Sequence, residues 1–556
     1  TGTAGGVVGL LQELTGSGGR PRRSLAALVP VAGALAALNT WQVRRREELD
    51  RDLPPEGSDA SLAKSIAYGA GLAVALSAFA SGERAFADVL SRAMARVLPG
   101  NEMMWRPAAH AATLAGLGYA GRFLSEQTLH RIEQAQESVE AAFDVPPPNE
   151  FVSGSFESLV PFATLSRAGR RFVWTVSLPD VIEEVMAEPA GTTPIRAYVG
   201  IESAPTEDDR VELMMRELER THAFDRAWIM FASPTGTGYV NYAAATILEF
   251  LTLGNCATVA MQYSARPSPL SLDRVAEGRH HARKLISRLQ ERIARCPAGT
   301  RPKLLLFGES LGAWTSQDAF APRGTQGLVD DGVDHAIWIG TPYFSKWKDR
   351  VLNSERPDVD PTLVGVFNDI GEWQALDPAA RDRIRYVMIT HYDDGVAVFG
   401  PTLAVQAPEW LRGESRPRTV PKGMRWMPTT TFFQVLVDMK NAANVVPGVF
   451  AARGHDYRAD LLPFFHETLK FDATPDQLAR IGAWLEQREL IRSNWMKTHK
   501  TVDQSLAAAV LDRLLREERA AGTNANDRIV NLVRTIAFEE FDAGSGAPTE
   551  APDPAP

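Results

Sequence analysis

Apolar and polar positions change their pattern twice along the chain. Over residues 1–145, uncharged runs at 24–43, 65–82 and 107–121 alternate with polar segments, and arginines bracket the first run on both sides. Roughly twenty apolar residues can span a bilayer as a helix, and arginines suit the headgroup region. We therefore expect an all-α, membrane-embedded domain, with its orientation left open. Because the runs are rich in alanine and glycine, the alternative is a set of helices buried in protein.

A different pattern begins after the stiff linker "DVPPPNE" and continues to about residue 473. Short, continuously apolar runs alternate here with amphipathic stretches, which is typical of a mostly parallel sheet covered by helices on both faces. Residues 146–473 therefore predict an α/β domain with its function at the carboxyl ends of the strands. The expected strands are 195–201, 226–232, 256–264, 302–308, 335–340 and 384–390.

Two further segments flank or interrupt this domain. Residues from about 396 to 450 exceed what a strand and a short loop require, and they contain several Trp and Phe. Amphipathic aromatic segments in that place can form a cap over a site, and the alternative is an ordinary strand and helix whose aromatics are core. Residues 474–542 are expected to be helical, and 543–556 form a tail too polar and Pro/Gly-rich to fold.

Composition excludes some classes of function. At 556 residues the chain is too long for one ordinary core, and its formal net charge of −9 argues against a nucleic-acid surface. Its two cysteines, Cys256 and Cys296, provide neither a disulfide framework nor a zinc-ligand cluster.

The segment "GESLG" at 308–312 is the first candidate for chemistry. Gly-x-Ser-x-Gly is a weak signal alone, but here it follows an apolar strand and precedes a stretch that can start a helix. A nucleophile elbow needs that strand–turn–helix arrangement, because flanking glycines relieve crowding and the helix N-terminus favours a developing oxyanion. We therefore predict that Ser310 is a nucleophile and that the Leu311 amide is one oxyanion donor. The alternative is a glycine-rich turn that only closes a strand.

A serine nucleophile needs a base and an acid, which follow it in the order acid, then histidine, in this arrangement. His455 lies in a glycine-preceded loop that runs into a helix, "GHDYRADLLPFF", and is the predicted base. Asp394 follows the last predicted strand and is the predicted acid, with Asp393 as its alternative and the more suitable turn former. Three other histidines after Ser310 are expected to be structural or at the surface: His335, His466 and His499. His391 ends a strand just ahead of the two aspartates, so it would be a neighbour of the acid.

The second oxyanion donor is expected in the loop after an earlier strand. Residues 233–238, "SPTGTG", follow a buried strand and contain two glycines, so Thr235 and Gly236 are the candidates. The loop lacks the Gly-Lys-Ser/Thr ending of a phosphate loop, which argues against nucleotide binding. A turn that serves no site is the alternative.

Together these motifs resemble a bacterial α/β-hydrolase family that is well represented in actinobacteria. The resemblance rests on "SFESLVPFATLSRAGRRFV" (155–173), "SPTGTGYVN", "GESLGAW", "HYDDGVAVFGP" and "GHDYRADLLPFF", and extends from the first apolar run to about residue 470. It implies a multi-helix membrane domain ahead of an α/β-hydrolase fold, and a Ser-Asp-His triad at Ser310, Asp394 and His455. The family's acid motif is Ser-Asp-Pro, whereas this chain has Asp393-Asp394-Gly395, so the choice between the two aspartates stays open.

These features lead to a functional expectation. We expect a serine hydrolase of the esterase or lipase type that cleaves an ester of a membrane lipid or an aminoacylated lipid at a bacterial inner membrane. Its partners would be the acyl-ester substrate and the membrane, with no nucleic acid, no cofactor and no metal, while homo-oligomers stay open. Acyl transfer, amide or peptide cleavage, and a non-catalytic membrane scaffold are the alternatives.

Overall fold

The computed structural model describes most of the α/β region and parts of the flanking segments. The described residues are 82–113, 115–116, 143–266, 271, 274–353, 355–411, 424–428, 430–441 and 445–498. The chain divides into two compact units, one of Gln134–Ala397 with Pro447–Pro556 and the other of Thr1–Glu133 with Val398–Val446.

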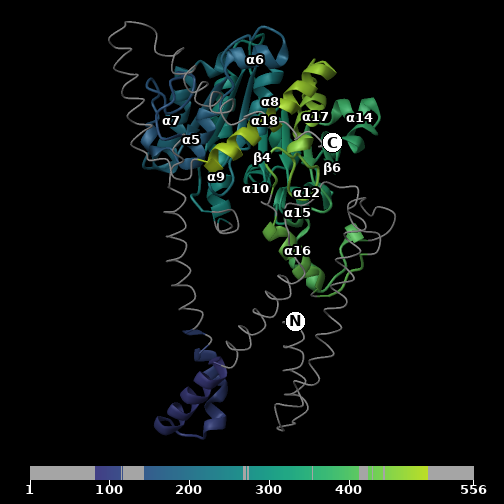
Figure 1. Ribbon diagram of the computed structural model, residues 1–556. Helices are drawn as coiled ribbons and strands as arrows, with labels where there is room; N and C mark the ends of the chain where they lie inside the picture. The colour runs from purple at the N-terminus through teal and green to yellow at the C-terminus, as the bar shows by residue number, and fades with distance from the viewer. Residues whose placement is uncertain are drawn as a thin grey trace, which may run out of the picture. The chain divides into compact units, whose positions relative to one another are not determined.

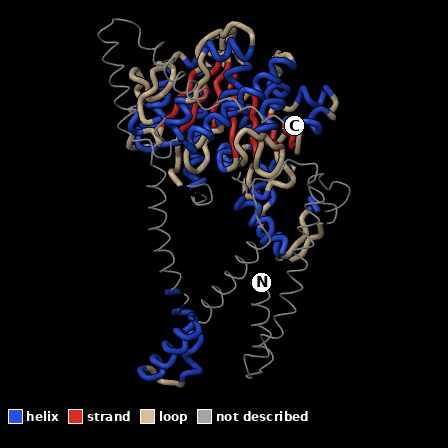
Figure 2. The backbone as a smooth tube through the Cα atoms, in the orientation of Figure 1, coloured by secondary structure: helices blue, strands red, loops and turns tan. Residues whose placement is uncertain are grey.

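A parallel sheet forms the centre of the first unit (Figure 2). In the described residues it has seven strands in the order β1-β3-β2-β4-β5-β7-β6, and every neighbouring pair is parallel. Six strands match the expected apolar runs. The sequence pattern did not reveal β6, a four-residue edge strand in which only two residues are buried. The strands are β1 (Ile195–Val199), β2 (Trp228–Ser233), β3 (Cys256–Met261), β4 (Lys303–Glu309), β5 (His335–Ile339), β6 (Val364–Phe367) and β7 (Tyr386–Ile389).

Helices pack in two groups with the sheet between them (Figure 1). One group contains α7 (Glu207–Arg220), α9 (Val275–Ile293), α10 (Leu311–Asp318) and α12 (Lys346–Asn353). The other contains α6 (Pro179–Met186), α8 (Tyr242–Leu251), α17 (Arg458–Leu469) and α18 (Pro475–Thr498). Sheet and helices share one buried apolar core, and this architecture fits an α/β-hydrolase fold. In the described residues of this unit, the remaining α-helices are α5 (Arg167–Trp174), α11 (Gly324–Asp330), α13 (Ile370–Gln374), α14 (Pro378–Arg383) and α15 (Gly395–Val398).

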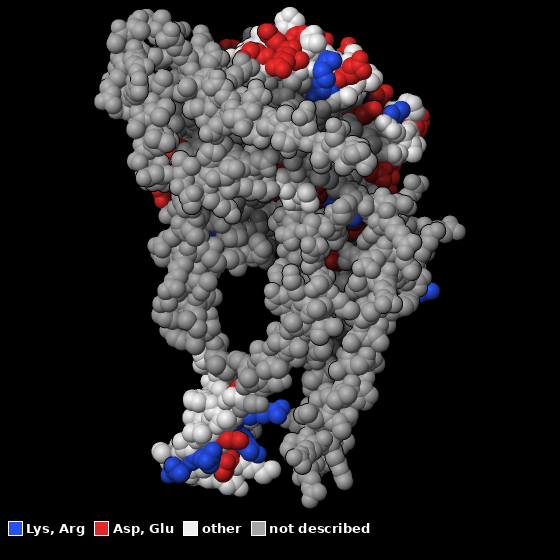
Figure 3. Space-filling model, in the orientation of Figure 1, with Lys and Arg blue, Asp and Glu red and all other residues white. Residues whose placement is uncertain are grey.

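The second unit contains two helical stretches, 82–97 and 102–113, and much of the predicted cap. Asp88 and Arg106 form an ion pair of 2.9 Å in the helical stretches, where Figure 3 shows charged side chains of both signs together. None of the described helices is both long and apolar enough to cross a membrane. The apolar runs at 24–43 and 65–81, and most of 114–121, lie outside the described residues, as do 499–556.

The predicted cap segment is helical wherever it forms regular structure in the described residues. It contains the short 3-10 helices η8 (Pro401–Ala404) and η9 (Glu409–Leu411), and α16 (Thr430–Asn441), which contacts η8. Some aromatic side chains of this segment pack against one another, as expected of a core, and others are exposed, as expected of a cap. Phe432 packs on Phe399 with ring centres 5.1 Å apart, whereas Phe433 is half exposed.

A buried ion pair joins the first strand to the helical layer beside it. Arg196 on β1 and Glu249 on α8 are both fully buried, and two hydrogen bonds of 2.6 and 3.0 Å connect them. Arg196 also donates to the Phe172 carbonyl and the Thr175 hydroxyl at 2.8 Å, while Glu249 accepts from the Ser177 amide at 3.0 Å. The pair therefore ties α5 and the segment after it to the edge of the sheet.

We predict that Glu249→Gln lowers the free energy of unfolding by about 3–5 kcal/mol, because it leaves the Arg196 charge buried without its counter-ion. Glu219→Gln is the matched control, since Glu219 pairs with Arg292 on the exposed faces of α7 and α9. The control should cost at most about 1 kcal/mol. Urea unfolding measures both, and equal effects of the two substitutions would contradict the structural role of the pair.

Candidate active site

A strained turn connects β4 to α10 at Ser310. Ser310 has φ 54° and ψ −119°, a conformation that residues with side chains rarely adopt. Its neighbours must be small: a Cβ on Gly308 would lie 2.6 Å from the Ala313 nitrogen, and a Cβ on Gly312 would lie 2.1 Å from the Ser233 carbonyl oxygen. This is the geometry of a nucleophile elbow, and a turn that only closed a strand would not need it.

The close contact of Gly312 with Ser233 brings the turn against the loop after β2. That loop is tight, because the Thr235 amide donates to the Tyr239 carbonyl and the Gly238 amide donates to the Thr235 carbonyl, both at 2.9 Å. The Thr235 amide is therefore engaged within its own loop, which leaves Gly236 and Leu311 as candidate oxyanion donors. Leu311 is the first residue of α10, where the N–H groups have no partner within the helix.

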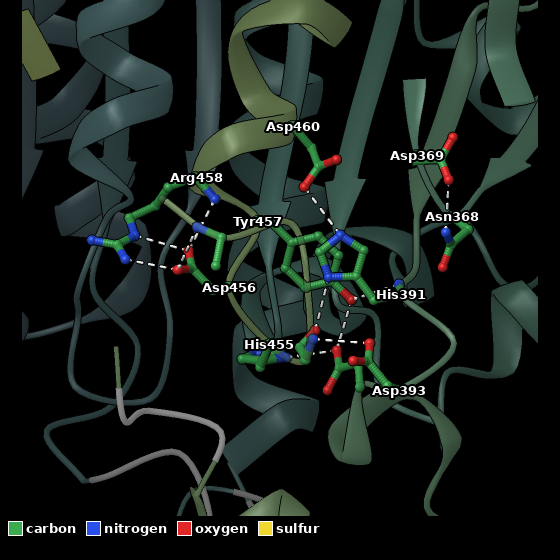
Figure 4. Close-up of polar contacts among 12 residues, drawn as sticks. Asn368, Asp369, His391, Asp393, His455, Asp456, Tyr457, Arg458 and Asp460 are labelled. Carbon is green, nitrogen blue, oxygen red and sulfur yellow. Dashed lines mark hydrogen bonds and ion pairs between the residues drawn. The ribbon is translucent and has the colours of Figure 1, made fainter. Parts of the chain in front are cut away.

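The segment after β7 carries both aspartates that were candidates for the acid. Asp394 is fully buried, and its Oδ2 lies 2.7 Å from Nδ1 of His455. Asp393 instead accepts a hydrogen bond from the Gly454 amide at 2.9 Å (Figure 4). Of the two aspartates that the sequence left open, the structure pairs Asp394 with His455, and Asp393 holds the backbone of the histidine loop.

Three donors surround the Asp394 carboxylate. Besides His455, the Tyr457 hydroxyl donates to Oδ2 at 2.7 Å and the Val396 amide donates to Oδ1 at 2.8 Å. Burial alone would raise the pKa of the Asp394 carboxyl, but the charge of His455 and these hydrogen bonds outweigh burial and lower that pKa. Asp394 is thus held ionised, and its Oδ1 also caps the start of α15.

His455 lies against the end of β5, next to the strained turn. Its ring faces Gly340, which follows Ile339, and the Ile339 carbonyl accepts a hydrogen bond from the Ser310 amide at 3.0 Å. Burial would lower the pKa of the imidazole, but the Asp394 charge, with smaller contributions from Glu309 and Asp456, raises it. Among the described residues, no hydrogen bond joins the Ser310 hydroxyl to this ring; such contacts often tighten only when substrate binds.

A family model described as an alpha/beta-hydrolase family matches residues 195–481, and its companion for the N-terminal part of the same family matches residues 7–175. The chain belongs to this α/β-hydrolase family. No curated protein and no solved structure matches it. Membership indicates a hydrolase in general.

Several polar residues of this α/β-hydrolase were not found from the sequence. Asn241 at the start of α8 donates to Glu309 at 3.0 Å, which links the loop after β2 to the residue before Ser310. Desolvation raises the pKa of the Glu309 carboxyl, against the opposing effects of His455 and Asn241. Tyr457 lies two residues after His455, and this His-x-Tyr spacing in "GHDYRAD" was the sequence signal that could have pointed to Tyr457.

The other histidines and the two cysteines form no second site in the described residues. His391 is buried and pairs with Asp460 at 3.0 Å, and His335 begins β5, where burial lowers its pKa to about 4. His466 lies within α17, and His499 is outside the described residues. Cys256 and Cys296 are free and buried. Within the described part of the chain, no group of three or more His, Cys, Asp or Glu side chains could hold a metal ion.

We predict that Gly340→Ala displaces the imidazole. Gly340 has φ 57°, and a Cβ there would lie 2.5 Å from Cε1 of His455 and 2.9 Å from a ring carbon of Tyr457. Because misplacing a catalytic group by about 1 Å can cost 10²-fold, the rate of reaction with a fluorophosphonate probe should fall by about that factor or more. Gly299→Ala, where a Cβ meets open space, is the control. Equal rates for both variants would show that the ring does not depend on this contact.

The rate should also depend on pH with a defined sign. A general base must be neutral, and the pKa of His455 is raised above its ordinary value of about 6.5. We therefore expect kcat/KM for a soluble ester to be highest at alkaline pH and to fall as the pH drops through an apparent pKa above 6.5. An acid limb at or below that value would contradict the charge environment of the ring.

Proposed function

We propose that the chain is a serine hydrolase that cleaves a carboxylic ester through an acyl-enzyme on Ser310. The observation that carries the proposal is the 2.7 Å contact between Asp394 and His455 at the strand end beside a turn that is strained at Ser310. Ser310 follows β4, Asp394 follows β7 and His455 precedes α17, so the three residues lie in three different loops. A fold that had lost catalysis would have no reason to keep a buried carboxylate, a perturbed imidazole and a strained serine together.

The chemistry follows from the roles of these groups. His455 takes the hydroxyl proton of Ser310 through the ring nitrogen that Asp394 does not bind, while Ser310 Oγ attacks the ester carbonyl carbon. The amides of Leu311 and Gly236 stabilise the resulting oxyanion. The ester C–O bond then breaks, and the leaving alcohol takes the proton from His455. Water, deprotonated by the same imidazole, then attacks the acyl carbon. The bond from that carbon to Ser310 Oγ breaks, the acid leaves, and His455 returns the proton to Oγ.

We extend the proposal to an ester of a membrane lipid or an aminoacylated lipid, hydrolysed at the cell membrane. Its support is the pattern of the N-terminal region, where uncharged runs at 24–43 and 65–82 have the length of bilayer spans and arginines flank the first. A hydrolase held at a bilayer meets lipids as its most concentrated esters. The aromatic segment at 396–450 offers apolar surface suited to an acyl chain.

Ser310→Ala tests the nucleophile. The wild-type protein should be labelled by a fluorophosphonate probe on a peptide that contains Ser310, and the variant should lose both labelling and ester hydrolysis by several orders of magnitude. Ser158→Ala is the matched control, because Ser158 is a partly buried serine whose hydroxyl bonds Glu217 near the end of α7. Labelling of Ser310→Ala at the wild-type rate, or no labelling of the wild type, would contradict the proposal.

The same two proteins also test the substrate class. Incubated with vesicles made from a total lipid extract, the wild type should release an acid from one class of lipid ester, and Ser310→Ala should not. Transfer of the acyl group to an added alcohol or amine would assign the enzyme to acyl transfer instead. Hydrolysis of short soluble esters with every bilayer lipid untouched would overturn the lipid assignment and leave the serine mechanism standing.

A further inference from the structure

Tyr457 and His455, the predicted catalytic base, both bond the same carboxylate oxygen of Asp394, the predicted acid. Its hydroxyl donates to Asp394 Oδ2 at 2.7 Å, the same oxygen that lies 2.7 Å from Nδ1 of His455. Both side chains come from one short loop before α17, and their rings meet edge to face with centres 5.7 Å apart (Figure 4). Tyr457 is almost fully buried, so water does not compete for its hydroxyl.

The direction of this hydroxyl is fixed by a second contact. The backbone N–H of His391 donates to the Tyr457 oxygen at 3.1 Å, so the phenol accepts on that side and its hydrogen points to Asp394. The two contacts form a chain from the His391 amide through the Tyr457 hydroxyl to the carboxylate. A tyrosine in such a chain cannot turn its hydrogen elsewhere without breaking one of the two bonds.

The ring of Tyr457 is held as firmly as its hydroxyl. The His391 ring stacks on it with centres 4.1 Å apart and planes inclined by 14°. His391 is itself fixed by contacts with the Gly454 carbonyl at 2.9 Å and with Asp460 Oδ2 at 3.0 Å. Figure 4 shows these side chains packed together between the segment after β7 and the start of α17. The loop that carries His455 and the segment that carries Asp394 are thereby locked together.

We propose that Tyr457 is a positioning residue, which orients the Asp394 carboxylate and limits how much of its negative charge faces His455. This inference rests on the proposed serine mechanism. A hydrogen bond from the phenol draws charge toward itself, so the carboxylate stabilises the imidazolium less than it would with His455 as the sole donor to Oδ2. Tyr457 keeps its proton throughout, because burial and the Asp394 charge both raise the pKa of the phenol.

Other ionisable groups also face this cluster, and Tyr457→Phe replaces none of them. Glu309 at the end of β4 and Asp456 on the histidine loop act on His455. The groups that act on Asp394, Tyr457 or His391 are Lys348 on α12, Asp393, and Asp460 on α17. A pH shift caused by the substitution therefore reports the missing hydroxyl.

The first test is Tyr457→Phe in the full chain, assayed with a soluble ester. Losing a hydrogen bond to a charged group should lower kcat about 10- to 100-fold, with KM little changed because the phenol does not touch substrate. The acid limb of the pH profile should move to higher pH, because more carboxylate charge then faces the imidazole. Tyr386→Phe is the matched control: its hydroxyl bonds only a backbone carbonyl, that of Val333, at the opposite end of β7, and its kinetics should match wild type.

A second variant should shift the acid limb in the opposite direction, and its result does not depend on how well Tyr457→Phe folds. Replacing Tyr457 by 3-fluorotyrosine keeps the ring and the hydroxyl but makes the phenol a stronger donor, so the acid limb should move to lower pH. In addition, Tyr457→Phe combined with Asp394→Asn should label with a fluorophosphonate no more slowly than Asp394→Asn alone, because the hydroxyl acts through that carboxylate.

Two outcomes overturn the inference. One is an acid limb that stays in place in both Tyr457 variants, which would reduce Tyr457 to a structural residue. The other is a further rate loss when Tyr457→Phe is added to Asp394→Asn. Failure of the proposed function is distinguishable from both, since the wild-type protein would then show no serine labelling and no pH-dependent ester hydrolysis to perturb.

Discussion

The strained backbone at Ser310 is the constraint on which the site depends. A positive φ at a residue with a side chain costs about 1–3 kcal/mol, and it persists because β4 lies between β2 and β5 and the Ser310 amide bonds the Ile339 carbonyl. The strain forces an abrupt change from strand to helix. Gly312 then packs against the Ser233 carbonyl, so the start of α10 meets the loop after β2. A single steric requirement thus places the candidate nucleophile and the candidate oxyanion donors side by side.

The opposite side of the site is organised by charge. A carboxylate as buried as Asp394 would be costly without partners, and its three donors come from the loop that carries His455 and from the turn that starts α15. The interactions that keep the acid ionised therefore also hold the histidine in place. The neighbouring Asp393 contributes through the Gly454 backbone, so the two aspartates divide the work of orienting the ring and fixing its loop.

Helix α18 supports this loop from outside. Arg458 pairs with Glu489 on α18, bonds Asp456 at 2.7 Å, and donates to the Val449 carbonyl at 2.7 Å. The Gly448 amide donates to Glu489 at 2.7 Å. Residues after 474 were expected to be helical and were given no chemistry. Their first helix nevertheless contacts both ends of the segment that carries His455, because Glu489 accepts from the Gly448 amide at one end and pairs with Arg458 at the other.

Local pattern determined much of this protein. Continuous apolar runs predicted six strands, because a strand buried on both faces is mostly apolar, whereas β6 is only four residues long and contains a glycine, so its short run did not stand out as a strand. Chain order and flanking glycines made Ser310 and His455 the candidates, since a strained turn has its own local composition. The sequence already favoured Asp394 over Asp393, but the pairing of Asp394 with His455 and the contacts of Tyr457 and Glu309 were decided by tertiary structure alone. Each depends on the direction of a hydrogen bond between segments far apart in the chain, and such a direction exists only once the strands have fixed where those segments meet.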